Sequence, residues 1–339
     1  MSKPSRRSVI QGLAAGGSVT VTSLMTGCEL IDDIEDVVDD VVDSLAELEL
    51  GETQLVWNPD TGVIHQVIRE EHAVARLDAD RNEIWRYGWE YEEPDPEVPP
   101  EPTLNRPTHL IPNANGSVYV VDRGNHRIVH LDEDGGLINA FGTPGGGDGE
   151  LNHPVAAAVD ADGSLYVTDG KNHRVHVFDP DGTPAGTFGE FGYDSDETEL
   201  EDYQINTPHG IAVDRDGRVH VVDAGNARIH VFERGGEWVR SYGSFAEEGG
   251  DGLHFAPHSV TVDPLGNSWV SDPVHMVVQI YSPDGTPRLR LSDLTLADGR
   301  HVAPLEIGFS AAGAVYARVL AWNDEEPPEG EPDEDEGEQ

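Results

Sequence analysis

Residues 154–189 read PVAAAVDADGSLYVTDGKNHRVHVFDPDGTPAGTFG, and this stretch decides the fold. Short runs rich in apolar and β-branched residues are separated by Asp-Gly turns, which is the pattern of short antiparallel strands. The stretch predicts four strands, the first three over residues 155–160, 164–169 and 174–179 and the fourth ending at Phe188. One such unit cannot bury both of its faces alone, so it requires neighbours of the same kind.

The same unit recurs along the chain with fixed internal spacing. In four consecutive units a Pro is followed nine residues later by a Gly, and six residues after that by Asp122, Asp169, Asp223 or Asp272. The register extends back to Gly62 and forward to Pro304 and Gly313, where the last copy stops after two strands. Five full units and one partial unit predict an all-β, six-bladed propeller. Either residues 43–57 complete the partial sixth blade, or that blade has fewer strands.

The turns between the second and third strands carry a distinctive polar sequence. Residues 122–127 read DRGNHR, residues 169–174 read DGKNHR and residues 223–228 read DAGNAR, whereas residues 272–277 read DPVHMV. These runs resemble NHL repeats, which are named for an Asn-His-Leu type motif, and the resemblance covers roughly residues 53–322. It implies a propeller of the NHL type, a fold that serves many functions.

The repeated polar side chains of these turns are expected to be structural. Asp ends one strand and Arg begins the next, so a carboxylate faces a guanidinium across a tight turn and can also accept backbone N–H groups. Every blade carries a copy, whereas an active site is usually singular. We therefore predict a turn-fixing role for Asp122, Asp169, Asp223, Asp272, Asn125, Asn172, Asn226, Arg127, Arg174 and Arg228.

The N-terminal residues have the features of an export signal. Arg6 and Arg7 lie in the sequence SRRSVI, which resembles a twin-arginine motif, and a weakly apolar stretch follows it. Residues 24–28 read LMTGC and resemble a lipobox, in which cleavage leaves Cys28, the one Cys of the chain, for lipid attachment. We expect residues 1–27 to be the signal peptide of an extracytoplasmic protein that lipidated Cys28 holds on the membrane. The alternative is an unlipidated signal peptide with an incidental Cys.

The chain is strongly acidic, with 65 acidic and 21 basic residues and a formal net charge of −44. This balance argues against nucleic acid as a partner, because binding phosphates requires an excess of Lys and Arg. Acidic residues concentrate at both ends of the chain. Residues 28–52 predict an amphipathic helical stalk, or alternatively a partly disordered acidic one, and residues 323–339 predict a disordered tail. The propeller over residues 53–322 lies between them in the sequence. The acidic, Lys-poor composition is also typical of halophilic proteins.

Histidines mark the mouth of the predicted channel. The residue after the blade-opening Pro starts the innermost strand, and in two neighbouring units it is His209 or His258. The sequences Pro-His-Gly and Pro-His-Ser are similar to those of the peptidyl-hydroxyglycine amidating lyases, a resemblance that implies a zinc ion held by histidines in the channel. Zinc usually needs three protein ligands, so His109, His153, His301 or an Asp would have to supply the third. The alternative is that these histidines only form hydrogen bonds at the channel mouth.

Two classes of function remain open. The connections between units are long and acidic and are expected on the face where the strands of His209 and His258 begin, and loops on one face of a rigid scaffold are the usual place for binding. Without a complete catalytic set, we favour a non-enzymatic binding module for a protein, peptide or glycan at this face and at the channel mouth. The alternative is a metal-dependent lyase or hydrolase that uses His209 and His258. The carboxylates of the connections are candidates for calcium, although solvation in salty water is the simpler explanation.

Overall fold

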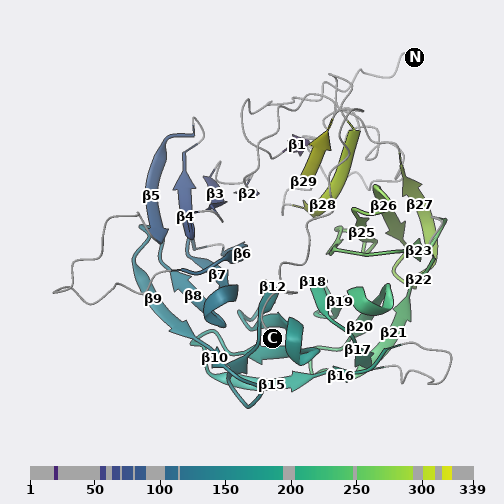
Figure 1. Ribbon diagram of the computed structural model, residues 1–339, viewed down its shortest axis with the longest axis horizontal. Coiled ribbons are helices and arrows are strands. Elements are labelled where there is room, and N and C mark those ends of the chain that lie inside the picture. Colours follow the sequence, from purple (N-terminus) through teal and green to yellow (C-terminus); the bar gives the residue numbers. More distant parts are fainter. Residues whose placement is uncertain are drawn as a thin grey trace, which may run out of the picture.

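The chain forms a ring of antiparallel sheets around a central axis (Figure 1). Five sheets have four strands each, paired in chain order, with the first strand innermost and the fourth outermost. The predicted all-β propeller of repeated four-stranded units is therefore confirmed. The computed structural model describes residues 19–21, 54–58, 63–68, 71–78, 81–88, 104–113, 115–193, 203–246, 250–292, 301–309 and 315–322.

The five four-stranded sheets are called blades 1 to 5. Blade 1 consists of β2 (Gln54–Asn58), β3 (Val63–Ile68), β4 (Ala73–Leu77) and β5 (Glu83–Gly88). Blade 2 consists of β6 (Pro107–Pro112), β7 (Val118–Asp122), β8 (Arg127–Leu131) and β9 (Leu137–Phe141). Blade 3 consists of β12 (Pro154–Val159), β13 (Leu165–Asp169), β14 (Arg174–Phe178) and β15 (Pro184–Phe188). Blade 4 consists of β18 (Pro208–Val213), β19 (Val219–Asp223), β20 (Arg228–Phe232) and β21 (Trp238–Tyr242). Blade 5 consists of β24 (Ser259–Val262), β25 (Ser268–Asp272), β26 (Val277–Tyr281) and β27 (Pro287–Leu291).

The sixth sheet has three strands, in the order β1 (Val19–Val21), β29 (Val315–Trp322), β28 (His301–Phe309). Residues 43–57 do not supply its missing strand within the described part of the chain, because β2 pairs with β3 in blade 1. β1 lies inside the predicted signal peptide, so cleavage after Gly27 would remove it from the edge of β29. Arg6, Arg7, Cys28, the predicted stalk over 28–52 and the predicted tail over 323–339 lie outside the described residues.

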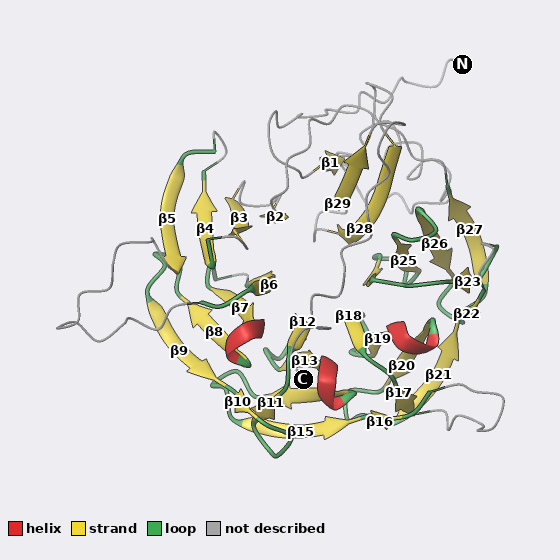
Figure 2. Cartoon of the chain, in the orientation of Figure 1, coloured by secondary structure: helices red, strands yellow, loops and turns green. Residues whose placement is uncertain are grey.

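The connections between blades lie at the same end of the strands as the turns between the second and third strands of each blade. We call this end the connection face. In blades 2, 3 and 4 the blade-opening Pro pairs with the Asp that ends the second strand, as Pro208 does with Asp223, so both segments meet there. Three turns on this face are short 3-10 helices (red in Figure 2), η1 (Arg123–Asn125), η2 (Gly170–Asn172) and η3 (Ala224–Asn226). Three connections contain parallel strand pairs, which are β10 (Thr143–Pro144) with β11 (Glu150–Leu151), β16 (Glu190–Phe191) with β17 (Gln204–Ile205), and β22 (Ser244–Phe245) with β23 (Leu253–His254).

The apolar core lies between neighbouring blades. One cluster joins Val121 and Ile128 of blade 2 to Val167 and Phe178 of blade 3, and all four side chains are buried. Blades 1 to 4 end with an aromatic residue followed by a Gly (Gly88, Gly142, Gly189 or Gly243), which we call the blade-ending Gly. The aromatic residue before it packs in these clusters, and the ring centroids of Phe188 and Phe232 are 4.8 Å apart. Burial of each large apolar side chain stabilises the fold by about 2 kcal/mol. A single sheet cannot cover its own apolar faces, and the neighbouring blades cover them instead.

The innermost strands approach one another closely at Gly210. Its N–H donates a hydrogen bond of 3.0 Å to the carbonyl oxygen of His258 in the next blade. A Cβ at Gly210 would lie 2.7 Å from the Cα of Ser259 and 2.8 Å from the carbonyl oxygen of His258. The Gly of the Pro-His-Gly sequence is therefore required by close approach of two backbones. Among the described residues there is no helix of the length and hydropathy needed to cross a bilayer.

Candidate functional site

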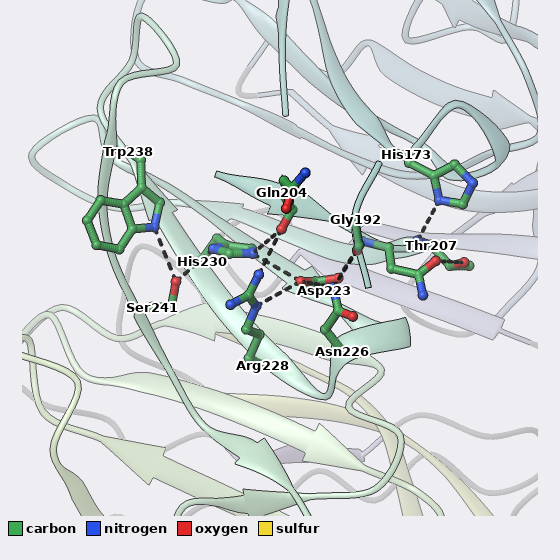
Figure 3. A network of polar contacts seen from close by, with 11 residues as sticks. His173, Gly192, Gln204, Thr207, Asp223, Asn226, Arg228, His230, Trp238 and Ser241 are labelled. Carbon is green, nitrogen blue, oxygen red and sulfur yellow. Dashed lines mark hydrogen bonds and ion pairs between the residues drawn. The ribbon is translucent and has the colours of Figure 1, made fainter. Parts of the chain in front are cut away.

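One fully buried carboxylate organises the connection-face turn of blade 4 (Figure 3). Asp223 accepts hydrogen bonds from the backbone N–H of Asn206 at 2.6 Å, from Nδ2 of Asn226 at 2.8 Å and from Nε of Arg228 at 3.0 Å. His230 Nε2 lies 3.0 Å from both Asp223 and the carbonyl oxygen of Gln204. Both neighbours only accept, so this nitrogen carries the proton.

Blades 2 and 3 repeat the same set of contacts. In blade 2 Asp122 accepts bonds from the N–H of Asn105, from Asn125 and from Arg127, and in blade 3 Asp169 accepts bonds from the N–H of Asn152, from Asn172 and from Arg174. Burial raises the pKa of Asp169, although these hydrogen bonds act in the opposite direction. The guanidinium of Arg174 also donates to the carbonyl oxygens of Gly146, Gly147 and Glu150. The polar residues thus clamp the incoming connection to the turn.

Blade 5 departs from this pattern, with Val277 in the place of Arg. Buried Asp272 accepts bonds from the backbone N–H of Phe255 at 2.8 Å and of His275 at 3.1 Å, and Nδ1 of His254 lies 3.7 Å away. Burial alone would raise the pKa of Asp272, but the nearby His254 and the two backbone N–H groups lower it. Gln279 donates to the carbonyl oxygen of Gly250 at 3.1 Å and so secures the connection that Arg secures elsewhere.

A second clamp, which we did not predict from the sequence, joins each of three blades to the next. The residue after the turn has the left-handed backbone conformation, and its ring Nδ1 accepts the backbone N–H of the residue before the next blade-opening Pro. The pairs are His72 with Arg106 at 2.9 Å, His126 with His153 at 3.2 Å, and His173 with Thr207 at 3.0 Å. The His of the repeated Asn-His-Arg sequence was the available signal. Because Nδ1 accepts, these contacts require neutral rings.

His209 and His258 meet at the start of the innermost strands of blades 4 and 5. Their ring centroids are 5.3 Å apart in an edge-on arrangement, and both side chains are half-buried. His258 Nδ1 lies 2.9 Å from the carbonyl oxygen of Leu305, which only accepts. The proton therefore resides on Nδ1, and Nε2 is the basic nitrogen of that ring.

The other candidate histidines have different partners. His109 Nδ1 accepts the backbone N–H of Ala157 at 3.2 Å, and His153 packs against the ring of His126 at 4.5 Å. Within the described ranges, no three His, Cys, Asp or Glu side chains are arranged to hold one metal ion. Of the histidines predicted to bind zinc, His209 and His258 are the two whose rings pack together in the described part of the chain.

Exposed aromatic side chains on two consecutive connections were also missed. Phe191 and Tyr193 are each 53% exposed and Tyr203 is 42% exposed. One blade further on, Phe245 is 58% exposed and Phe255 is 42% exposed. Singly exposed apolar side chains are common, but a contiguous exposed group of them often marks an interaction surface. The sequence signal was an aromatic residue two positions after the blade-ending Gly.

Comparisons of sequence agree with the repeat assignment. The family model for the NHL repeat matches residues 151–178 and 206–232. The chain is 43% identical over 56 residues to human NHL repeat-containing protein 3 and 41% identical over 56 residues to the mouse protein of that name. The matched segment spans 16% of this chain and 16% of the length of each relative.

Comparisons of structure agree with the fold. A streptogramin B lyase superimposes with a TM-score of 0.57 at 15% identity, covering 95% of this chain and 96% of its own. A catalytically inactive virginiamycin B lyase from Staphylococcus aureus, with a histidine replaced by alanine and with quinupristin, gives a TM-score of 0.54 at 13% identity, covering 81% of this chain and 83% of its own. Identities this low establish the architecture alone. The chain is thus similar to these lyases in architecture and carries NHL repeats within a β-propeller.

Proposed function

We propose that this chain is an extracytoplasmic propeller, tethered to the membrane through lipidated Cys28, that binds a partner through its connection face. The observation that carries the proposal is the set of aromatic side chains on the β16/β17 and β22/β23 connections, with exposures between 42% and 58%. Aromatic residues are enriched at interfaces, where they bury large areas at low entropic cost. The net charge of −44 supports a partner that is not nucleic acid.

The scaffold beneath these side chains supports a binding role. The clamps around Asp169 and Asp223 fix the turns, and Asn226 Nδ2 reaches the carbonyl oxygen of Gly192 at 3.0 Å. The backbone of the β16/β17 connection is therefore anchored on the blade that follows. A surface held in this way loses little conformational entropy on binding.

Site-specific photo-crosslinking tests this proposal. A photoreactive phenylalanine analogue at position 193 or 245 of the full-length protein is expected to give discrete adducts in the cell envelope. The matched control is position 265, because Leu265 is 39% exposed but lies in the turn at the opposite end of the blade 5 strands. Adducts of equal yield from all three positions, or adducts from position 265 alone, would reject the connection face as the contact.

A second candidate function is supported by the pair His209 and His258. The tautomer of His258 makes Nε2 its basic nitrogen, and the ring of His209 packs edge-on against this imidazole. A basic imidazole suits proton abstraction from a substrate. Similar propellers include virginiamycin B lyase, in which replacement of a histidine by alanine abolishes activity. In this candidate His258 removes a proton and His209 lies against it. A zinc ion would need a third ligand that the described residues do not bring together.

The lyase candidate makes a direct prediction. Purified protein, with and without added zinc, is expected to open quinupristin or cleave a peptidyl-hydroxyglycine, and His258→Ala to lose about a hundredfold or more of the rate. Val155→Ala is the control, because Val155 follows the blade-opening Pro of blade 3 as His258 follows that of blade 5. Intact substrates after incubation with the wild-type protein would eliminate the candidate.

A further inference from the structure

We infer that the two groups of exposed aromatic side chains on the connection face form a paired platform for arginine-rich segments of the partner. This inference rests on the proposed binding function and assigns the chemistry of the partner. The first group consists of Phe191, Tyr193 and Tyr203, and the second consists of Phe245 and Phe255.

The first group presents ring faces from a fixed backbone. Phe191 and Tyr193 are two residues apart, and their ring centroids are 6.1 Å apart. The ring of Phe191 also packs on His173, with centroids 4.6 Å apart. Gly192, between the two aromatic residues, donates its N–H to the carbonyl oxygen of Ile205 at 3.3 Å. The exposed rings are thus positioned before any partner arrives.

The second group lies one blade further round the ring and shares only its first aromatic position with the first group. Phe245 follows its blade-ending Gly at the same spacing as Phe191, and its ring lies 5.6 Å from that of Phe255. Phe255 in turn contacts the ring of His275 at 6.0 Å. The N–H of Ala246 donates to the carbonyl oxygen of His254 at 2.9 Å and fixes the segment. Two groups of exposed rings on successive blades suit an extended partner with more than one recognised side chain.

The sequence next to both groups is acidic, and this favours a cation. The nine residues between Tyr193 and Tyr203 include six acids and no base, and those between Phe245 and Phe255 include three acids and no base. Among the described residues, Glu190 is an exposed acid next to Phe191, and Asp251 is an exposed acid of the second connection. The face of an aromatic ring attracts a cation, and neighbouring carboxylates add to that attraction. A planar guanidinium can stack on the ring and bond a carboxylate at once, which favours Arg over Lys.

Fluorescence anisotropy with two labelled peptides tests this inference on the full-length protein. The first peptide alternates Arg and Gly, and the second has citrulline at every Arg position, which keeps the planar shape and removes the charge. We expect the Arg peptide to bind at least tenfold more tightly than the citrulline peptide, and to weaken as NaCl rises. Phe191→Leu with Phe245→Leu is expected to weaken the Arg peptide about tenfold, because Leu keeps apolar area without a ring face.

The controls separate this inference from the proposed function. Leu265→Ala, at the opposite end of blade 5, is expected to change binding less than twofold, and matching thermal melts show that each variant is folded. Equal binding of the Arg and citrulline peptides overturns the inference, and so does unchanged affinity of the double Leu variant for the Arg peptide. Photo-crosslinks at position 193 together with no binding of the Arg peptide would keep the proposed function and reject this partner class. Loss of the photo-crosslinks at position 193 when a neutral glycan such as cellohexaose is added, but not when the Arg peptide is added, would assign the platforms to carbohydrate instead.

Discussion

Asp223→Asn is expected to lower the free energy of unfolding by about 3 to 5 kcal/mol, as removal of one partner of a buried ion pair generally does. The carboxylate is fully buried and faces donors alone: the N–H of Asn206, Nδ2 of Asn226, Nε of Arg228 and Nε2 of His230. An amide of the same size offers one acceptor oxygen and places an NH₂ group against these donors. The guanidinium of Arg228 would then be left in a largely buried position without its counter-charge. Urea unfolding at pH 7 measures the loss.

The measurement has an internal control in the same blade. Asp216 is exposed in the turn between β18 and β19, so Asp216→Asn is expected to change stability by less than about 0.5 kcal/mol. Hydrogen exchange adds a positional check, because the N–H of Asn206 should lose protection before those of the blade 4 strands. A loss below 1 kcal/mol for Asp223→Asn would mean that the apolar contacts between blades hold the turn without the clamp.

Local repetition explains why the turns were predictable. Asp223, Asn226 and Arg228 lie within six residues and recur at the same offsets, so sequence spacing alone brings them together. The hydrogen bond from the N–H of Asn206 to Asp223 joins residues 17 apart in the sequence, and it forms only because the connection packs against blade 4. The inter-blade clamp of His173 to Thr207 depends on a left-handed backbone at His173, a conformation that few residues other than Gly adopt, and on the position of the next blade.

Exposure was the property that the sequence could not supply. The alternation of Phe191 and Tyr193 has the same pattern as a half-buried strand, and burial depends on whether another element covers it. The repeat register placed His209 and His258 on neighbouring blades, and their rings lie 5.3 Å apart. His109 lies one residue further along its strand than His209 does, and a shift of one residue in a strand reverses the side chain. His153 precedes its strand and has a left-handed backbone, so its ring packs against His126 instead.

Acidification from pH 6.5 to pH 4 is expected to cost this fold about 3 kcal/mol for each of two buried histidines. Burial, with a smaller contribution from a nearby arginine, lowers the pKa of His65 and of His176 from 6.5 to about 4. The unfolded chain therefore takes up protons first as the pH falls, while the folded chain resists them. The stability is fully present above pH 6.5 and declines until the folded pKa is reached. Denaturant midpoints between pH 7.5 and 4 measure the decline.

His176→Gln separates this titration from every other effect of acid. His176 Nε2 accepts the backbone N–H of Gly149 at 3.3 Å, and a protonated ring cannot accept it. The fifth blade shows that Gln fits the same position, since Oε1 of Gln279 accepts the equivalent N–H of Gly252 at 2.6 Å. The variant is therefore expected to match the wild type at pH 7.5 and to exceed it by about 3 kcal/mol at pH 4. Parallel pH curves for the two proteins would show that His176 takes up its proton equally in both states. In that case burial beneath the connection does not exclude water from the ring, and the acid sensitivity of the propeller arises elsewhere.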